Sequence, residues 1–217
     1  SEAMKLLTPL IGKDLEVVDD LAVYDDDTDS FSEVLFDGVS FIGFTPKNLA
    51  VVGSRFVKAD FSNVQLEGLG LENVVANDCM MLTANFGEAS WHTTEIINSR
   101  CSGVQLHSAT LKNVTFRGCK LDMANFRQAK LTNVVFDGCV VTDMDFGSAE
   151  LKNVEFIDCD IDGIDFTHAT LHNVDFRESR LVRVKRSSDF KGAIITASQL
   201  IYLAPQLAHG AGIKIED

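Results

Sequence analysis

Three cysteines recur at intervals of twenty residues, Cys119, Cys139 and Cys159, and they are the first candidates for metal or redox chemistry. A structural zinc ion needs four ligands that converge tetrahedrally. Three thiols in one column, with alanine, valine and phenylalanine around them, do not supply that geometry. Ser99 and Ser179 fall in the same column. We therefore predict small buried side chains and reduced thiols at these positions, and no metal or cofactor.

Acidic residues between 143 and 165 are the second candidates, because eight carboxylates there face a single Lys152, a net charge of −7. Carboxylates act as general acids or bases when a cleft shifts their pKa, and the sequence indicates no such cleft. The five histidines lack ligand spacing, and no phosphate-binding or nucleophile motif occurs. We therefore predict that the protein is not an enzyme. The eight carboxylates form a candidate acidic interaction surface: Asp143, Asp145, Glu150, Glu155, Asp158, Asp160, Asp162 and Asp165.

The elements that carry these residues follow from a five-residue repeat over 31–185. Nearly every fifth residue is large and apolar, and a smaller apolar or hydroxyl residue precedes it by two. On a helix, large residues at this spacing would be spread around the whole cylinder, and in a straight strand they would point alternately to opposite faces. Only a chain that turns a corner every five residues points all these side chains inward. Four corners close a square of twenty residues, and the next square stacks on it at about 4.8 Å. The 155 residues predict an all-β solenoid of about eight coils.

Stacked coils place identical side chains in columns, and asparagine or glycine two residues after each large one suits the corners. The predicted core columns are Phe116, Phe136, Phe156 and Phe176; Phe126, Phe146 and Phe166; Leu111, Leu131, Leu151 and Leu171; and Cys119, Cys139 and Cys159.

Segments such as "ANFRQAKL" and "SAELKNVEF" resemble the pentapeptide-repeat family over roughly 31–185. The resemblance implies a right-handed quadrilateral β-helix. The opening "DLEVVDDL" and the ending "GIKIED" resemble uncharacterised actinobacterial members, for which no activity is established. More distantly, the acidity and the order of rod and helix resemble the bacterial quinolone-resistance members, which bind DNA gyrase or topoisomerase IV as mimics of duplex DNA.

The segments that flank the repeat are expected to cap it. Residues 1–30 are acidic, lack the repeat and are interpreted as a lead-in or cap over the first coil. Within the rod, 42–55 is expected to be irregular, as a distorted coil or a protruding loop, because Pro46 occupies a large-residue position. Residues 186–217 contain Thr196 and Gln199 at capping-box spacing and should form a C-terminal helix that caps the rod and joins two copies. The candidate cap and dimer contacts are Leu200, Ile201, Leu203 and Leu207.

The net charge of −13 disfavours direct binding to nucleic acid and favours a basic protein surface as partner. No apolar run is long enough to span a membrane, and no signal peptide is visible, so a cytoplasmic location is expected. The predicted function is a non-enzymatic interaction module or scaffold that uses an acidic rod surface and an unknown protein partner. The alternative is a gyrase or topoisomerase IV binder that mimics DNA, and an enzyme with a hidden site is a third possibility. Residues 31–185 carry a net charge of only −6, far below the roughly 22 charges of a duplex of equal length, about 37 Å.

Overall fold

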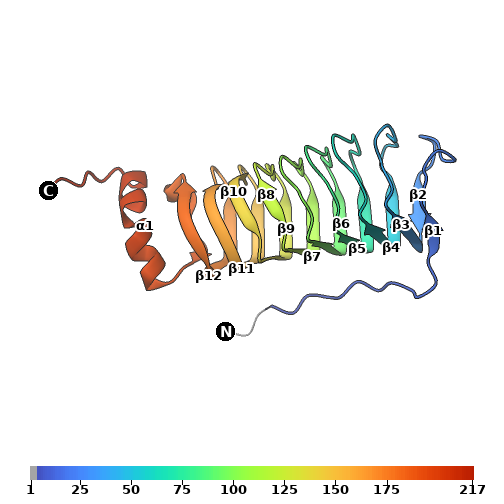
Figure 1. Cartoon of the computed structure of the whole chain (residues 1–217). Coiled ribbons are helices and arrows are strands. Elements are labelled where there is room, and N and C mark those ends of the chain that lie inside the picture. Colours follow the sequence, from blue (N-terminus) through green and yellow to red (C-terminus); the bar gives the residue numbers. More distant parts are fainter. Residues whose placement is uncertain (1–3) are drawn as a thin grey trace.

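The chain winds into a parallel β-solenoid of about nine turns that ends in one C-terminal helix, in a computed structural model that describes residues 4–217 (Figure 1). Residues 1–3 of the predicted lead-in lie outside the described residues. The strands are β1 (Glu16–Val18), β2 (Ser30–Ser32), β3 (Val34–Asp37), β4 (Ala50–Val57), β5 (Gly70–Asn77), β6 (Ser90–Ile97), β7 (Thr110–Arg117), β8 (Lys120–Asp122), β9 (Lys130–Asp137), β10 (Val140–Asp145), β11 (Glu150–Asp165), β12 (Thr170–Lys185) and β13 (Ala193–Ile194). A 3₁₀ turn η1 (Ser187–Asp189) and helix α1 (Ala197–Gly210) complete the fold.

Successive coils pair at an offset of twenty residues, as the repeat predicts. Phe116 pairs with Phe136 and Phe136 with Phe156, all in parallel ladders. The corners adopt left-handed backbone angles, for example φ 53° at Asn113 and 54° at Asn133. Asparagine tolerates this conformation better than most residues, and side-chain hydrogen bonds between the asparagines of neighbouring coils support it. The predicted fold class is confirmed.

Aromatic rings stack along the interior of the rod. The ring centroids of Phe116 and Phe136 are 5.1 Å apart, and those of Phe136 and Phe156 are 4.7 Å apart, with nearly parallel planes. A second column, Phe126, Phe146 and Phe166, stacks beside the first. All the predicted phenylalanine, leucine and cysteine columns are buried. Burial of each large side chain contributes about 1.5–3 kcal/mol before conformational entropy is subtracted.

One turn of the solenoid that the five-residue repeat did not predict is formed by the acidic lead-in. Strand β1 pairs with β3 at an offset of eighteen residues, so that Val18 lies beside Phe36. Leu21 is buried over the end of the core, and Asp26 accepts hydrogen bonds from the amide and hydroxyl of Thr45. Because the offset differs from twenty, the five-residue repeat could not reveal this turn.

The segment 42–55 keeps the register of the rod and does not protrude, and the expected distortion is confined to the face of Pro46, where no bridge joins Thr45 to Gln65 although Gln65 pairs with Asn85 of the next coil. Ala50 pairs with Ser30 on one side and with Gly70 on the other, at the standard offset. Pro46 is buried in the position that leucine or phenylalanine fills in other coils. Its ring therefore replaces their side chains without a change of register.

Helix α1 closes the other end of the rod. Thr196 and Gln199 form the predicted capping box, and one helix continues through Pro205. The Gln199 side chain donates to the carbonyls of Phe176 (2.7 Å) and Ser179 (2.8 Å). These bonds satisfy backbone groups of the last coil that have no further coil to pair with, a general need of exposed strand edges.

Candidate interaction surfaces

The cysteine column is a hydrogen-bonded part of the core. The Sγ atoms donate to backbone carbonyls 23 residues earlier: Cys119 to Ile96 (3.3 Å), Cys139 to Phe116 (3.3 Å) and Cys159 to Phe136 (3.2 Å). Ser179 makes the equivalent bond to Phe156 (2.7 Å), which explains why serine can take the place of cysteine in this column.

These thiols are protonated and chemically unreactive. Burial raises the pKa of Cys79 to about 11, and the hydrogen bond with the Cys101 thiol together with burial raises the pKa of Cys119 to about 12. A protonated buried thiol is a poor nucleophile and a poor metal ligand. Across residues 4–217, no group of three or more His, Cys, Asp or Glu side chains could hold a metal ion.

The eight carboxylates between 143 and 165 do not lie on one face of the rod. Corners with left-handed backbone angles at Asp143, Ser148, Asn153, Asp158 and Gly163 separate them. The face before Ser148 carries Asp145, which stacks on Asp165 of the next coil. Glu150, Glu155, Asp160 and Asp162 are distributed over the remaining three faces, and Asp143 and Asp158 occupy corners. This candidate surface is therefore a ring around the rod, and no single flat partner can contact all of it.

Basic side chains of the coil that contains Arg180 and Arg183 pair with part of this ring. Arg183 contacts Asp143 (2.7 Å) and Asp162 (3.2 Å), and Arg180 contacts Asp160 (2.7 Å). The Arg183 hydrogen bond lowers the pKa of Asp143. These exposed pairs contribute little stability, but they offset part of the local negative charge. Asp145 is likewise paired with Arg127 (3.2 Å), and Glu155 accepts a hydrogen bond from the amide of Met4.

An uncompensated concentration of negative charge lies instead at the N-terminal end of the rod. Residues 14–46 contain ten carboxylates and no lysine or arginine. We call this set the acidic end: Asp14, Glu16, Asp19, Asp20, Asp25, Asp26, Asp27, Asp29, Glu33 and Asp37. Among the ion pairs of the described residues, none involves these ten. The opposite end is basic, since 177–191 holds six lysines and arginines against two carboxylates.

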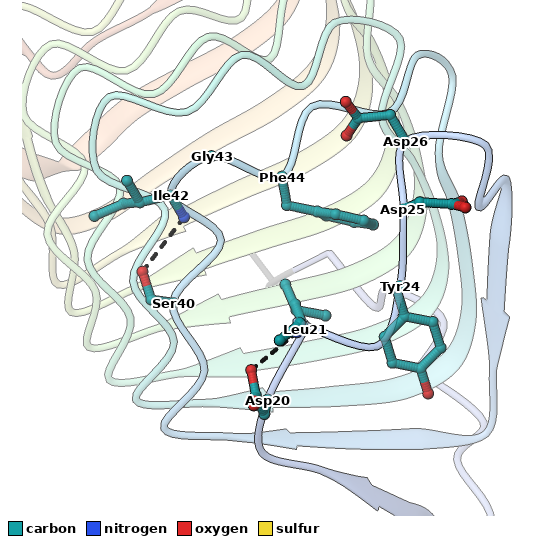
Figure 2. A pocket seen from close by; sticks show the side chains of 10 residues that line it. Asp20, Leu21, Tyr24, Asp25, Asp26, Ser40, Ile42, Gly43 and Phe44 are labelled. Atoms are coloured by element: carbon teal, nitrogen blue, oxygen red, sulfur yellow. Dashed lines mark hydrogen bonds between the residues drawn. The ribbon is translucent and has the colours of Figure 1, made fainter.

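A pocket of about 480 Å³ opens in the acidic end between the lead-in and the first full coil. Figure 2 shows the side chains of Leu21 and Phe44 between the carboxyl groups of Asp20 and Asp26. Tyr24, Asp25 and exposed Ile42 also belong to the lining. An apolar floor with acidic rims fits a lysine or arginine side chain, whose stem packs on the rings while its charged group meets a carboxylate.

Helix α1 divides the four predicted cap and dimer residues into two groups. Leu203 is fully buried against the last coil, and Leu207 packs at its margin. Leu200 and Ile201 point to solvent, as does the neighbouring Tyr202. The first group closes the rod, and the second leaves an apolar surface on the helix. In the part of the chain that the structure describes, no helix is long and apolar enough to cross a membrane.

A family model described as "Pentapeptide repeat region" matches residues 69–142, 111–185 and 129–201. No curated protein matches the chain. Among solved structures, QnrB1, a plasmid-mediated fluoroquinolone resistance protein, is similar at 19% identity and a TM-score of 0.49, covering 96% of this chain and 98% of that one. Rfr23 from the cyanobacterium Cyanothece 51142 is 11% identical, with a TM-score of 0.38 and coverage of 65% and 91%. HetL from Nostoc sp. strain PCC 7120, involved in heterocyst differentiation regulation, is 17% identical, with a TM-score of 0.28 and coverage of 81% and 87%.

Proposed function

Because the chain belongs to the pentapeptide-repeat family, we propose that it is a non-enzymatic protein-interaction module whose acidic end binds a basic surface of a partner protein. The observation that supports this function is the run of ten carboxylates without a cation, around a pocket with an apolar floor. Unpaired charges attract a partner of opposite sign over about one Debye length, and the pocket adds a specific contact for one basic side chain.

Charge reversal at the acidic end is expected to abolish partner capture. Asp19 and Asp27 are exposed, and among residues 4–217 no hydrogen bond is made to their side chains. The unmodified chain, when immobilised, should retain a basic protein from a lysate of its source organism. The double variant Asp19→Lys/Asp27→Lys should retain at least tenfold less of that protein. Raising the salt concentration should release the same protein, because exposed charges are screened.

The matched control is Glu88→Lys/Glu150→Lys, which makes the same change in net charge on exposed positions of the rod. This variant should retain the partner as well as the unmodified chain. Equal loss in both variants would show that only net charge matters, and equal retention in both would rule out the acidic end as the docking surface.

Mimicry of duplex DNA, the alternative inferred from the resemblance, would need rows of negative charge along the rod. One outward row reads Asp60, Met80, Arg100, Lys120, Val140, Asp160 and Arg180 through successive paired coils. Such mixed signs fit poorly to a surface built for DNA. A type II topoisomerase therefore stands second as a partner, and inhibition of gyrase supercoiling by the added protein would support it.

We also propose that α1 joins two copies of the chain through Leu200, Ile201 and Tyr202. These three consecutive residues make the side of α1 that faces away from the rod apolar, and such a surface is suited to a symmetric contact with another copy. Light scattering should give twice 23.8 kDa for the unmodified chain and 23.8 kDa for Ile201→Asp. Met123→Asp, an exposed apolar position on the rod, should leave the mass unchanged. A monomeric mass for the unmodified chain at high concentration would exclude this contact.

A further inference from the structure

Residues 4–15 form an extended arm along the outside of the rod, running from the C-terminal coils back to the first ones (Figure 1). The amide of Leu10 donates to Oδ1 of Asn73 (3.0 Å), and the amide of Met4 donates to Oε1 of Glu155 (3.1 Å). These two partners are four coils apart, about 19 Å at strand spacing. Six extended residues span about 20 Å, so the arm crosses the coils almost fully stretched.

Under the arm lies a row of outward-facing residues that are nevertheless buried. Val75, Thr115 and Val135 each lie between two inward-facing neighbours of their strands, so their side chains point away from the core. They are only 6%, 7% and 7% exposed, and the two valines do not belong to the core cluster. All three lie in the coils that the two anchor points of the arm span. They belong to one column of paired residues, in which Glu95 lies between Val75 and Thr115.

Outward-facing valines that the arm does not cross are much more exposed. Val52 is 38% exposed and Val140 is 46% exposed. The low exposure of Val75, Thr115 and Val135 is therefore due to the arm, which covers them. We call these three residues the valine stripe.

The arm has one side turned toward the rod. Met4, Leu6, Pro9 and Ile11 are half-buried, whereas Leu7 and Leu10 are exposed; burial alternates on each side of Thr8, where its phase changes by one residue. Across the described residues, no backbone–backbone hydrogen bond joins 4–15 to the rod. The arm is thus held by apolar side chains and by its two anchors. Segments with few hydrogen bonds and shallow burial open at low free-energy cost.

We propose that the valine stripe is a docking surface for an extended aliphatic segment of a partner protein, and that the arm is its intramolecular competitor. The arm itself shows the chemistry that fits: aliphatic side chains along one side of a stretched backbone, laid across the coils. Because it is tethered, the arm acts at a high effective concentration and excludes weak competitors. The stripe is distinct from the acidic end and does not depend on it.

The test uses full-length variants and a fluorescent peptide with the sequence of residues 4–15, MKLLTPLIGKDL. Leu6→Asp/Ile11→Asp places carboxylates on the inward face of the arm and should release it. Leu7→Asp/Leu10→Asp makes the same chemical change on the exposed face. Fluorescence anisotropy should show at least tenfold tighter peptide binding by the inward variant than by the unmodified chain, and no change for the outward variant.

A second pair of substitutions locates the binding site. Val135→Asp added to the inward variant should return peptide binding to the level of the unmodified chain. Val140→Asp, on another face, should leave it high. Loss of binding in both, or in neither, would overturn the assignment to the stripe.

Methyl NMR signals of Val75 and Val135 report release of the arm independently of peptide binding. They should shift in the inward variant and stay in place in the outward variant. If the signals shift but the peptide does not bind, the stripe is not a docking surface. If they do not shift, the arm is not held there by Leu6 and Ile11, and the proposal is equally wrong.

Discussion

Replacing Phe136 by alanine is expected to lower the free energy of unfolding by about 3–5 kcal/mol. The ring is fully buried and lies between the rings of Phe116 and Phe156, with edge contacts to Phe126 and Phe146. Removing it leaves a cavity that two stacked coils cannot close without breaking their twenty-residue register. Urea unfolding followed by circular dichroism measures the change.

The architecture makes this position more sensitive than a comparable residue in a globular core. Each coil contacts only its two neighbours, so a defect at Phe136 weakens both interfaces of one coil and no other part of the chain compensates. Met123→Ala, at a side chain that is 65% exposed, should change stability by no more than about 0.5 kcal/mol. A similar small change for Phe136→Ala would contradict the stacked core.

Replacing Leu203 by aspartate is expected to detach the C-terminal cap. Leu203 is completely buried over the last coil, where an unpaired carboxylate costs on the order of 3–5 kcal/mol. Detachment would expose the ring of Phe190, which packs on Phe166 and Phe176. Hydrogen exchange of α1 should accelerate strongly, and a dye that binds apolar surface should fluoresce.

Ile201→Asp is the control, because this residue lies two positions away on the same helix but is 77% exposed. It should leave the exchange of α1 unchanged when both proteins are monomeric. If Leu203→Asp also leaves it unchanged, the helix is held by the Gln199 and Gln206 hydrogen bonds rather than by burial of Leu203.

The rod could be predicted because one local rule generates it. Large apolar residues at every fifth position cannot all be buried on one side of a straight helix or strand. Residues such as Phe116 and Phe136 therefore specify both the square coil and its stacking. The capping box of Thr196 and Gln199 marked the helix start for a similarly local reason. The lead-in follows no such rule, because β1 pairs at an offset of eighteen residues and Leu21 lies outside the repeat.

The charge of the exterior was harder to predict, since neighbours on the surface are twenty residues apart in the chain. The run 143–165 has a strongly negative composition, yet Arg180 and Arg183 of the following coil lie beside Asp160 and Asp162. Charge summed along columns, rather than along the chain, would have indicated this compensation. The same tabulation shows Val75, Thr115 and Val135 as outward positions without a charged side chain, with Glu95 between the first two.

The constant offset of twenty residues also makes the length of the molecule adjustable in whole steps. Inserting or deleting one complete coil changes the separation of the acidic and helical ends by about 4.8 Å and leaves every remaining ladder with the same kind of neighbour. Gene duplication of a single sixty-nucleotide unit could therefore tune the spacing between two bound partners without redesigning either binding end. The rod can therefore act as a spacer whose length changes by whole coils.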